Sequence, residues 1–115
     1  MGKASRKARL PKREGRKVKV GPVGAVPPGR GATVQLKSGA EVALFNVDDQ
    51  YYAVENFCPH KGFPLADSRL YGHTVECDLH GWQFDVRNGD CMTKKSCPIE
   101  TFKVTVEDGW IYLEI

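Results

Sequence analysis

The sequence predicts one small all-β domain, built as an antiparallel sandwich or barrel. Short stretches of alternating apolar and polar residues recur from residue 17 to the end of the chain, which is the pattern of half-buried strands. Turn-forming Gly, Pro, Asn and Asp residues separate these stretches about every 8–12 residues, a spacing typical of sandwiches and barrels. No segment carries apolar residues at helical spacing over three or more turns. The length of 115 residues fits a single domain.

The expected strands can be placed in order along the chain. Valines alternate with lysines in the first strand, which Gly21-Pro22 should end. Lys37-Ser38-Gly39 joins the second strand to the third, and Asp48-Asp49 joins the third to the fourth. Asp108-Gly109 should form the turn of a final hairpin. The expected strands are 18–20, 33–36, 41–46, 50–54, 83–86, 102–106 and 110–113.

Charge divides the chain into two parts. Residues 1–20 hold nine basic side chains and one acidic side chain, whereas residues 21–115 hold eight basic and 13 acidic side chains. A stretch crowded with like charges and lacking apolar periodicity cannot bury enough surface to offset the entropy of ordering it. We therefore expect a basic, disordered tail over residues 1–16 and an acidic folded domain over residues 17–115.

Several classes of protein do not fit this sequence. No apolar run approaches the ~20 residues that span a bilayer, and no apolar signal-peptide segment follows the basic N-terminus, so we expect a cytoplasmic protein without a membrane segment. The basic tail has no interleaved aromatic residues, which argues against nucleic-acid binding. No Ser-His-Asp set, paired carboxylates or phosphate-binding glycine loop is present, so we expect no catalytic site.

Two short motifs in residues 58–82 carry the functional signal. This segment is rich in Gly, Pro, Cys and His, and we expect two loops around a short link. Cys58-Pro59-His60 is followed, after sixteen residues, by Cys77-Asp78-Leu79-His80. Gly62 and Gly81 follow the two motifs, where the backbone must bend tightly.

Two interpretations of the two Cys and two His residues in these motifs, Cys58, His60, Cys77 and His80, stay open. Two Cys and two His can bind one structural zinc ion, or they can bind a 2Fe–2S cluster with both Cys on one iron and both His on the other. A zinc finger usually pairs Cys with Cys and His with His. Each motif here is mixed, which favours the cluster.

The two motifs resemble the cluster-binding boxes of Rieske-type ferredoxins. The resemblance rests on Cys58-Pro59-His60-Lys61-Gly62 and on the segment from Cys77 to Asp85, and it extends from Val18 to Ile115. It implies a small antiparallel β-sandwich or barrel with two cluster-binding loops at one tip. It also implies one [2Fe–2S] cluster per chain, bound by Cys58, His60, Cys77 and His80.

The resemblance is to the ferredoxin components of bacterial ring-hydroxylating dioxygenases. It implies a one-electron carrier, rather than an enzyme, that takes electrons from a flavin-dependent reductase and passes them to a terminal oxygenase. The sequence also resembles the Rieske-like small subunit of assimilatory nitrite reductase, which is the alternative. An alternative of another class is a zinc-stabilised binding module.

Departures from the respiratory and photosynthetic Rieske proteins indicate a low reduction potential. Those proteins have a disulfide between the two loops, and the matching positions here are Phe63 and Leu79. Their high-potential members also place hydroxyl groups near the cluster, where this chain has Trp82 and Phe84. Hydrogen bonds to the cluster raise its potential. We therefore expect a midpoint within about 100 mV of −150 mV, the low end of the Rieske range.

Five other residues lie in or near the two motifs. Phe63 and Trp82 should shield the cluster from water, and one of them should also contact the partner protein. Cys91 and Cys97 are interpreted as small apolar core or loop residues, because a disulfide is not expected in the cytosol. His73 is expected to be a surface residue rather than a ligand.

Overall fold

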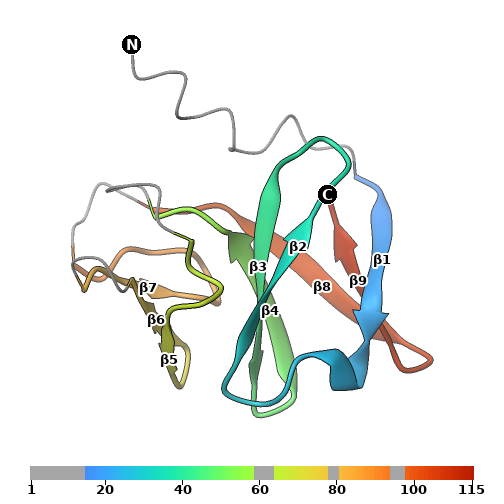
Figure 1. The fold of residues 1–115 in the computed structure, drawn as a ribbon, viewed down its shortest axis with the longest axis horizontal. Helices are drawn as coiled ribbons and strands as arrows, with labels where there is room; N and C mark the ends of the chain where they lie inside the picture. Colours follow the sequence, from blue (N-terminus) through green and yellow to red (C-terminus); the bar gives the residue numbers. More distant parts are fainter. Residues whose placement is uncertain (1–14, 59–63, 78–80, 94–97) are drawn as a thin grey trace.

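The computed structural model describes residues 15–58, 64–77, 81–93 and 98–115, and these ranges form nine strands and one short 3-10 turn (Figure 1). Within them, no helix is long and apolar enough to cross a membrane. The elements are β1 (Lys17–Pro22), η2 (Val23–Ala25), β2 (Gly31–Gln35), β3 (Glu41–Val47), β4 (Gln50–Glu55), β5 (Arg69–Tyr71), β6 (Thr74–Glu76), β7 (Gln83–Asp85), β8 (Thr101–Glu107) and β9 (Trp110–Glu114).

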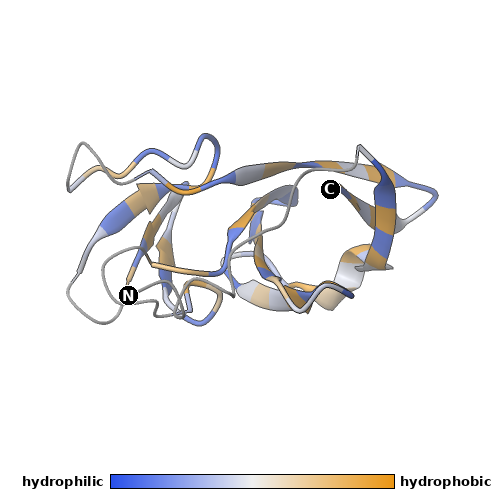
Figure 2. Ribbon diagram, turned by 90° about the horizontal axis from the view of Figure 1, so that it is seen from above, coloured by the Kyte–Doolittle hydropathy of each residue, from blue (hydrophilic) through white to orange (hydrophobic). Residues whose placement is uncertain are grey.

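The strands form two antiparallel sheets. The larger sheet has six strands in the order β1-β9-β8-β4-β3-β2, and the smaller sheet has three in the order β5-β6-β7. The larger sheet curls into an open half-barrel, which is visible from above in Figure 2, and the smaller sheet lies beside it. The expected all-β antiparallel fold is therefore confirmed.

Two tight turns have the backbone geometry that the sequence predicts. Asp48 and Asp49 have φ angles of 52° and 69°, and Asp108 and Gly109 have φ angles of 52° and 80°. Positive φ at both central residues is the requirement of a type I′ hairpin, because its twist matches that of the flanking strands. Asp and Gly tolerate this region better than most residues. These turns set the register of β3 against β4 and of β8 against β9.

Strand β3 runs between the two buried clusters of the molecule. Ala43, Phe45 and Val47 point into one cluster, whereas Val42 and Leu44 point into the other. Because both faces of the strand are covered, its apolar residues form a continuous run instead of alternating with polar ones. We call the first cluster the site-end core and the second the barrel core.

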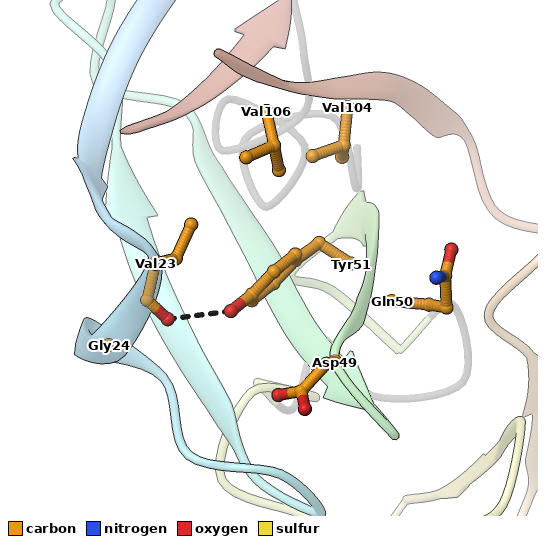
Figure 3. A pocket seen from close by; sticks show the side chains of 7 residues that line it. All are labelled: Val23, Gly24, Asp49, Gln50, Tyr51, Val104 and Val106. Atoms are coloured by element: carbon orange, nitrogen blue, oxygen red, sulfur yellow. Dashed lines mark hydrogen bonds between the residues drawn. The ribbon is translucent and has the colours of Figure 1, made fainter. Parts of the chain in front are cut away.

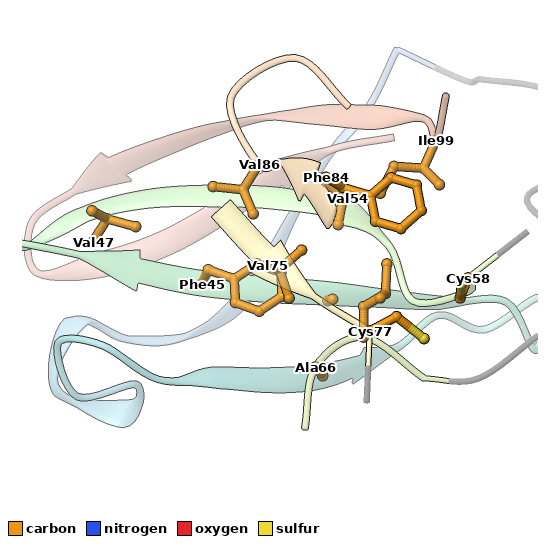
Figure 4. Close-up of a cluster of buried hydrophobic side chains, with 12 residues drawn as sticks. Phe45, Val47, Val54, Cys58, Ala66, Val75, Cys77, Phe84, Val86 and Ile99 are labelled. Carbon is orange, nitrogen blue, oxygen red and sulfur yellow. The ribbon is translucent and has the colours of Figure 1, made fainter. Parts of the chain in front are cut away.

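The site-end core joins the two sheets, and the barrel core fills the half-barrel. The site-end core contains Phe45, Leu65, Phe84 and both motif cysteines, Cys58 and Cys77 (Figure 4). The barrel core contains residues of β3, β4, β8 and β9, with Ile111 and Leu113 fully buried. The barrel core is thus a scaffold, and the site-end core carries the functional residues.

The structure differs from the expected strands in two places. Residues 69–76, expected as a link between loops, form β5 and β6. These strands have three residues each and only Val75 is fully buried, so the sequence gives no alternation long enough to detect. Strand β1 continues to Pro22 with a register shift between Lys19 and Gly21. A proline is tolerated there because β1 lies at the edge of the sheet.

Candidate metal centre

The structure brings the two motif cysteines into one buried cluster. Cys58 lies just beyond β4, and Cys77 lies directly after β6. Their exposed fractions are 1% and 2%, and both belong to the site-end core (Figure 4). Segments 19 positions apart in the sequence therefore deliver two thiols to the same region of the molecule.

The other expected ligands lie outside the described residues. His60 is two positions after Cys58, and His80 is three positions after Cys77. Phe63, Gly62 and Cys97 also fall outside the described ranges. Within those ranges no group of three or more metal-binding side chains is found, as expected when half of a four-residue ligand set is not described.

Backbone hydrogen bonds join Cys77 to Gly81 and Trp82, the described residues on the other side of the second motif. The Cys77 amide donates to the Trp82 carbonyl at 2.7 Å, and the Gly81 amide donates to the Cys77 carbonyl at 2.9 Å. Gly81 has a φ of 73°, which lies in the left-handed region where a side chain is costly. The expectation that Gly81 serves a tight bend is thus confirmed, and the bend holds Cys77 beside the start of β7.

A buried polar residue that the sequence did not point to, Asn56, lies next to the first motif and bonds to three other segments. The Asn56 side chain lies two positions before Cys58 and is only 6% exposed. Its carboxamide oxygen accepts from the Ala66 amide at 2.7 Å, and its nitrogen donates to Glu41 at 3.1 Å and to Thr33 at 3.2 Å. The signal available in the sequence was an amide side chain at the junction of a strand and a ligand motif.

Large apolar side chains surround the two cysteines. Leu65, Val75 and Phe84 are fully buried in the same cluster, and Trp82 packs against it while partly buried. The buried ring of Phe84 contributes no hydrogen-bond donor to this cluster. Cys91 also packs against this cluster and forms a β-bridge with Phe84.

His73 belongs to a polar contact between the two sheets. Its ring meets the Tyr52 ring edge-on, with centroids 5.4 Å apart, and its carbonyl accepts from the Val86 amide at 2.9 Å. Nearby, Arg87 donates two side-chain hydrogen bonds to Asp85, at 3.0 and 2.9 Å. These bonds hold the pKa of Asp85 below its ordinary value. The position of His73 is that of a packing residue on the partly exposed surface.

The chemistry of the described donors fits an iron–sulfur cluster. Two thiols of two separate loops lie at the edge of one apolar core, and a Rieske centre takes two thiolates on one of its irons. The apolar walls formed by Phe84 and Leu65 keep water from this side of the thiols. A Cys₂His₂ zinc site would use the same two thiols, so this geometry alone admits both metals.

A separate cleft lies at the far end of the half-barrel (Figure 3). Strands β4 and β8 pair only through Ala53–Phe102 and Val54–Thr101, and beyond these pairs they diverge. The cleft between them has a volume of about 710 Å³ and is lined by Val23, Val104, Val106 and Tyr51, among others. The Tyr51 hydroxyl donates to the Val23 carbonyl at 2.6 Å, and burial raises the pKa of Tyr51. No described lining residue is a Cys or a His, so the cleft is distinct from the metal centre.

Comparison with known proteins identifies the domain. The family model of the Rieske [2Fe–2S] domain matches residues 16–103. The ferredoxin component of the p-cumate 2,3-dioxygenase system of Pseudomonas putida is 34% identical over 84 residues, which cover 71% of each chain. These similarities favour a 2Fe–2S cluster over zinc at this donor set.

Two solved structures are similar to this chain in both sequence and fold. A chain in the complex of reduced oxygenase and oxidized ferredoxin in carbazole 1,9a-dioxygenase is 33% identical, with a TM-score of 0.77 and with 84% of this chain and 99% of that chain covered. A putative NADH-dependent nitrite reductase small subunit from Mycobacterium tuberculosis is 25% identical, with a TM-score of 0.79 and coverage of 85% and 93%. Both of the related families suggested by the sequence are thus represented.

Proposed function

Because the chain belongs to the Rieske [2Fe–2S] domain family, we propose that it is a one-electron carrier that receives electrons from a flavin-dependent reductase and passes them to a terminal oxygenase. The chain carries one [2Fe–2S] cluster, and this cluster supplies the one-electron chemistry. The observation that carries the proposal is the convergence of Cys58 and Cys77, both buried, from two separate loops. The relatives that support it are ferredoxin components of dioxygenase systems.

The burial of the two thiols supports a division of the four proposed ligands between the two irons. Cys58 and Cys77 hold the inner iron, because their side chains lie within the site-end core. His60 and His80 hold the outer iron, each through one ring nitrogen, as in Rieske centres. The second ring nitrogen of each is left for solvent or for the partner protein, and electrons pass at this end.

Two aromatic residues limit the access of water to the cluster. Trp82 packs against the core that contains both thiols, and Phe63 follows the first motif in the sequence. Excluding water around a metal centre lowers the local dielectric constant and tunes its potential. One of these two side chains also contacts the partner in the transient complex.

Charge favours encounter with a basic partner surface. Residues 21–115 hold 13 acidic and eight basic side chains, so the folded part is net negative. Complementary charge speeds association more than it tightens the complex, which suits a carrier that must leave after each electron. A relative of this fold has been solved together with its oxygenase. We place the protein in the cytoplasm, where reductase and oxygenase would both be accessible.

A small subunit of nitrite reductase is the second candidate. The similarity to the Mycobacterium tuberculosis protein supports it, but the identity is lower than the 34% shared with the dioxygenase ferredoxin component. The two candidates differ in assembly, because a subunit stays bound to its enzyme and a carrier dissociates. Gel filtration of the protein with each candidate enzyme separates them.

The proposal is tested with the purified protein and two pairs of variants. We expect a red-brown protein with about two irons per chain and a midpoint potential within about 100 mV of −150 mV. Cys58→Ser should abolish iron binding, whereas Cys91→Ser, which changes a cysteine of the same core, should retain it. Similarly, His60→Ala should lose the cluster and His73→Ala should keep it.

Electron transfer itself is measured by reduction of the oxygenase in the presence of the reductase and NADH. The carrier should raise the rate in proportion to its concentration, and the Cys58→Ser variant should not. A colourless protein with one zinc per chain would refute the cluster. A coloured protein that fails to reduce any ring-hydroxylating oxygenase, but copurifies with a nitrite reductase, would favour the second candidate.

A further inference from the structure

We propose that Asn56 is the positioning residue of the first ligand loop, defined here as residues 57–65. Its carboxamide oxygen bonds to Ala66, the residue after the end of the loop, and its carboxamide nitrogen bonds to Glu41 and Thr33 of the six-stranded sheet. This inference rests on the proposed function, in which Cys58 and His60 of this loop bind the cluster. It adds a residue that does not touch the metal but fixes where the ligands stand.

The hydrogen bonds of Asn56 span the loop. The carboxamide oxygen accepts from the Ala66 amide at 2.7 Å, across ten positions of sequence. The Asn56 amide donates to the Glu41 carbonyl at 3.1 Å, so the main chain is anchored to β3 as well. A segment whose two ends are joined has fewer conformations to lose when it binds a metal, which lowers the entropic cost of binding.

The orientation of the carboxamide is fixed by its partners. The Ala66 main-chain nitrogen can only donate, so it requires the oxygen of Asn56. The Glu41 carboxylate accepts from the carboxamide nitrogen at 3.1 Å, and Thr33 lies 3.2 Å from the same nitrogen. Reversing the carboxamide would place oxygen against carboxylate and nitrogen against an amide donor. Only a side chain with both an acceptor and a donor satisfies this site.

The segment that Asn56 holds returns directly into the core. Leu65 is fully buried and Ala66 is 2% exposed, and both belong to the cluster that contains Cys58 and Cys77. The Asn56–Ala66 bond is therefore buried between the departing and returning ends of the loop. A bond of this kind is stronger than an exposed one, because no water can replace it.

The chain offers a matched control in Asn46. This residue is 1% exposed, and its carboxamide also bonds in both directions. The nitrogen donates to the Val26 carbonyl at 2.7 Å, and the oxygen accepts from the Asp49 amide at 2.7 Å. Asn46 thus supports the β3–β4 turn, at the opposite end of β4 from Cys58. Replacing it should weaken the fold without loosening the ligand loop.

The first experiment compares Asn56→Ala with Asn46→Ala in the cluster-loaded protein. An excess of iron chelator is added, and the half-life of the visible absorbance of the cluster is measured together with the denaturation midpoint. We expect Asn56→Ala to shorten the half-life about tenfold, as for the loss of one buried hydrogen bond to the loop. Asn46→Ala should change it less than about twofold at a similar loss of stability. Equal half-lives in the two variants would overturn the proposal.

The second experiment exchanges donor and acceptor across the Asn56–Glu41 pair. Asn56→Asp keeps the acceptor for Ala66 but sets two carboxylates against each other, so the cluster should be lost about tenfold faster. Adding Glu41→Gln supplies a donor from the other side and returns the pair to a single negative charge. The double variant should have a half-life within about twofold of that of the unaltered protein. The line width of its electron-spin signal in the reduced state should match that of the unaltered protein.

The exchange variant keeps the test decisive if Asn56→Ala does not fold. Failure of Glu41→Gln to rescue Asn56→Asp would overturn the proposal. The double variant restores both the single negative charge of the pair and a donor–acceptor contact between the two side chains, so the cluster should again be retained. Absence of a cluster from the unaltered protein would refute the proposed function and this inference with it. A stable cluster in the unaltered protein and in both Asn56 variants would refute this inference alone.

Discussion

The six-stranded sheet and the three-stranded sheet differ in how many residue pairs join their strands. Strands β3 and β4 are joined by six residue pairs, and β8 and β9 by five. In the smaller sheet, β5, β6 and β7 have three residues each and are joined by three pairs at each interface. A three-residue strand buries little apolar surface, so the small sheet depends on the loops and on the group that they carry.

The two cores reflect the same division. The barrel core is made of aliphatic and aromatic side chains together with two alanines, whereas the site-end core also includes Cys58 and Cys77, the two cysteines that we propose as ligands. A metal group that binds only the folded loops stabilises them by linkage. From this comparison we expect the large sheet to be stable through its apolar contacts and the small sheet to need the bound cluster for full stability.

Removal of the iron should have the largest effect and should be confined to the small sheet. In the proposed site the cluster joins the loops on either side of the β5–β6 hairpin. Amide hydrogen exchange in β5–β7 should therefore accelerate about a hundredfold after chelation, as for a ligand that adds about 2.7 kcal/mol. Exchange in β3 and β4 should change less than about threefold. Hydrogen–deuterium exchange with mass spectrometry measures both. Equal acceleration in the two sheets would contradict the division.

Two buried leucines, one in each core, test whether only the site-end core affects iron binding. Leu65 in the site-end core and Leu113 in the barrel core are both fully buried. Replacing either with Ala should lower the free energy of unfolding by about 2–5 kcal/mol, since each change leaves a cavity. Only Leu65→Ala should also speed iron loss, because Leu65 directly precedes the anchored Ala66. Urea denaturation and chelation kinetics of the two variants are the measurements, and iron loss from both at the same rate is the contrary result.

A pair of glycines compares the loops of the two regions. Gly89 and Gly109 have φ angles of 81° and 80°, where a side chain costs about 1–2 kcal/mol. At Gly109 an added Cβ meets open space, whereas at Gly89 it would stand 2.0 Å from the Ile99 carbonyl oxygen. The Ile99 amide donates to the Gly89 carbonyl at 2.9 Å, so the two backbones cannot move apart without breaking this bond.

Gly109→Ala should therefore cost about 1–2 kcal/mol, and Gly89→Ala should cost clearly more. Thermal unfolding followed by circular dichroism measures both variants. The turn at Gly109 serves as the control, because it has the same backbone conformation without the contact. Similar losses at the two positions would show that conformation alone decides the cost.

A pair of surface ion pairs should give the smallest effects. Arg87 lowers the pKa of Asp85, chiefly through its side-chain hydrogen bonds. Because the folded pKa lies below the unfolded value, the stabilisation is present above pH ~4 and is lost as the pH falls through the folded pKa. The stability difference between the unaltered protein and Asp85→Asn should shrink over this range. Denaturation at pH 7 and at successively lower pH measures it.

The Lys17–Glu107 pair of the larger sheet is the control for Asp85. Its side chains are 45% and 52% exposed, whereas the Asp85 side chain is only 13% exposed. Exposed ion pairs contribute little because water and salt screen them. Glu107→Gln should thus change stability less than Asp85→Asn at pH 7. A larger effect of Glu107→Gln would mean that the exposed fraction of the side chains does not predict which ion pair contributes more to stability.

The sequence predicted most of the larger sheet and the all-β fold, whereas the four ligands stay a prediction. The hairpin turns at Asp48-Asp49 and Asp108-Gly109 and the strands around them were found, because alternation and turn chemistry are local properties. Strands β5 and β6 were missed, since three residues are too few to establish a period. The role of Asn56 was also missed, because its partners Thr33, Glu41 and Ala66 lie 23, 15 and ten positions away.

By itself, the sequence determined the all-β class, the two mixed Cys-His motifs and the family. Each of these depends on residue types at short, fixed spacing, which the chain encodes directly. Only the tertiary structure decided that Cys58 and Cys77 share one core, that β3 contributes to two cores and that Asn56 bonds to Thr33, Glu41 and Ala66. Those facts depend on contacts between segments that are distant in sequence, and such contacts exist only once the two sheets have packed against each other.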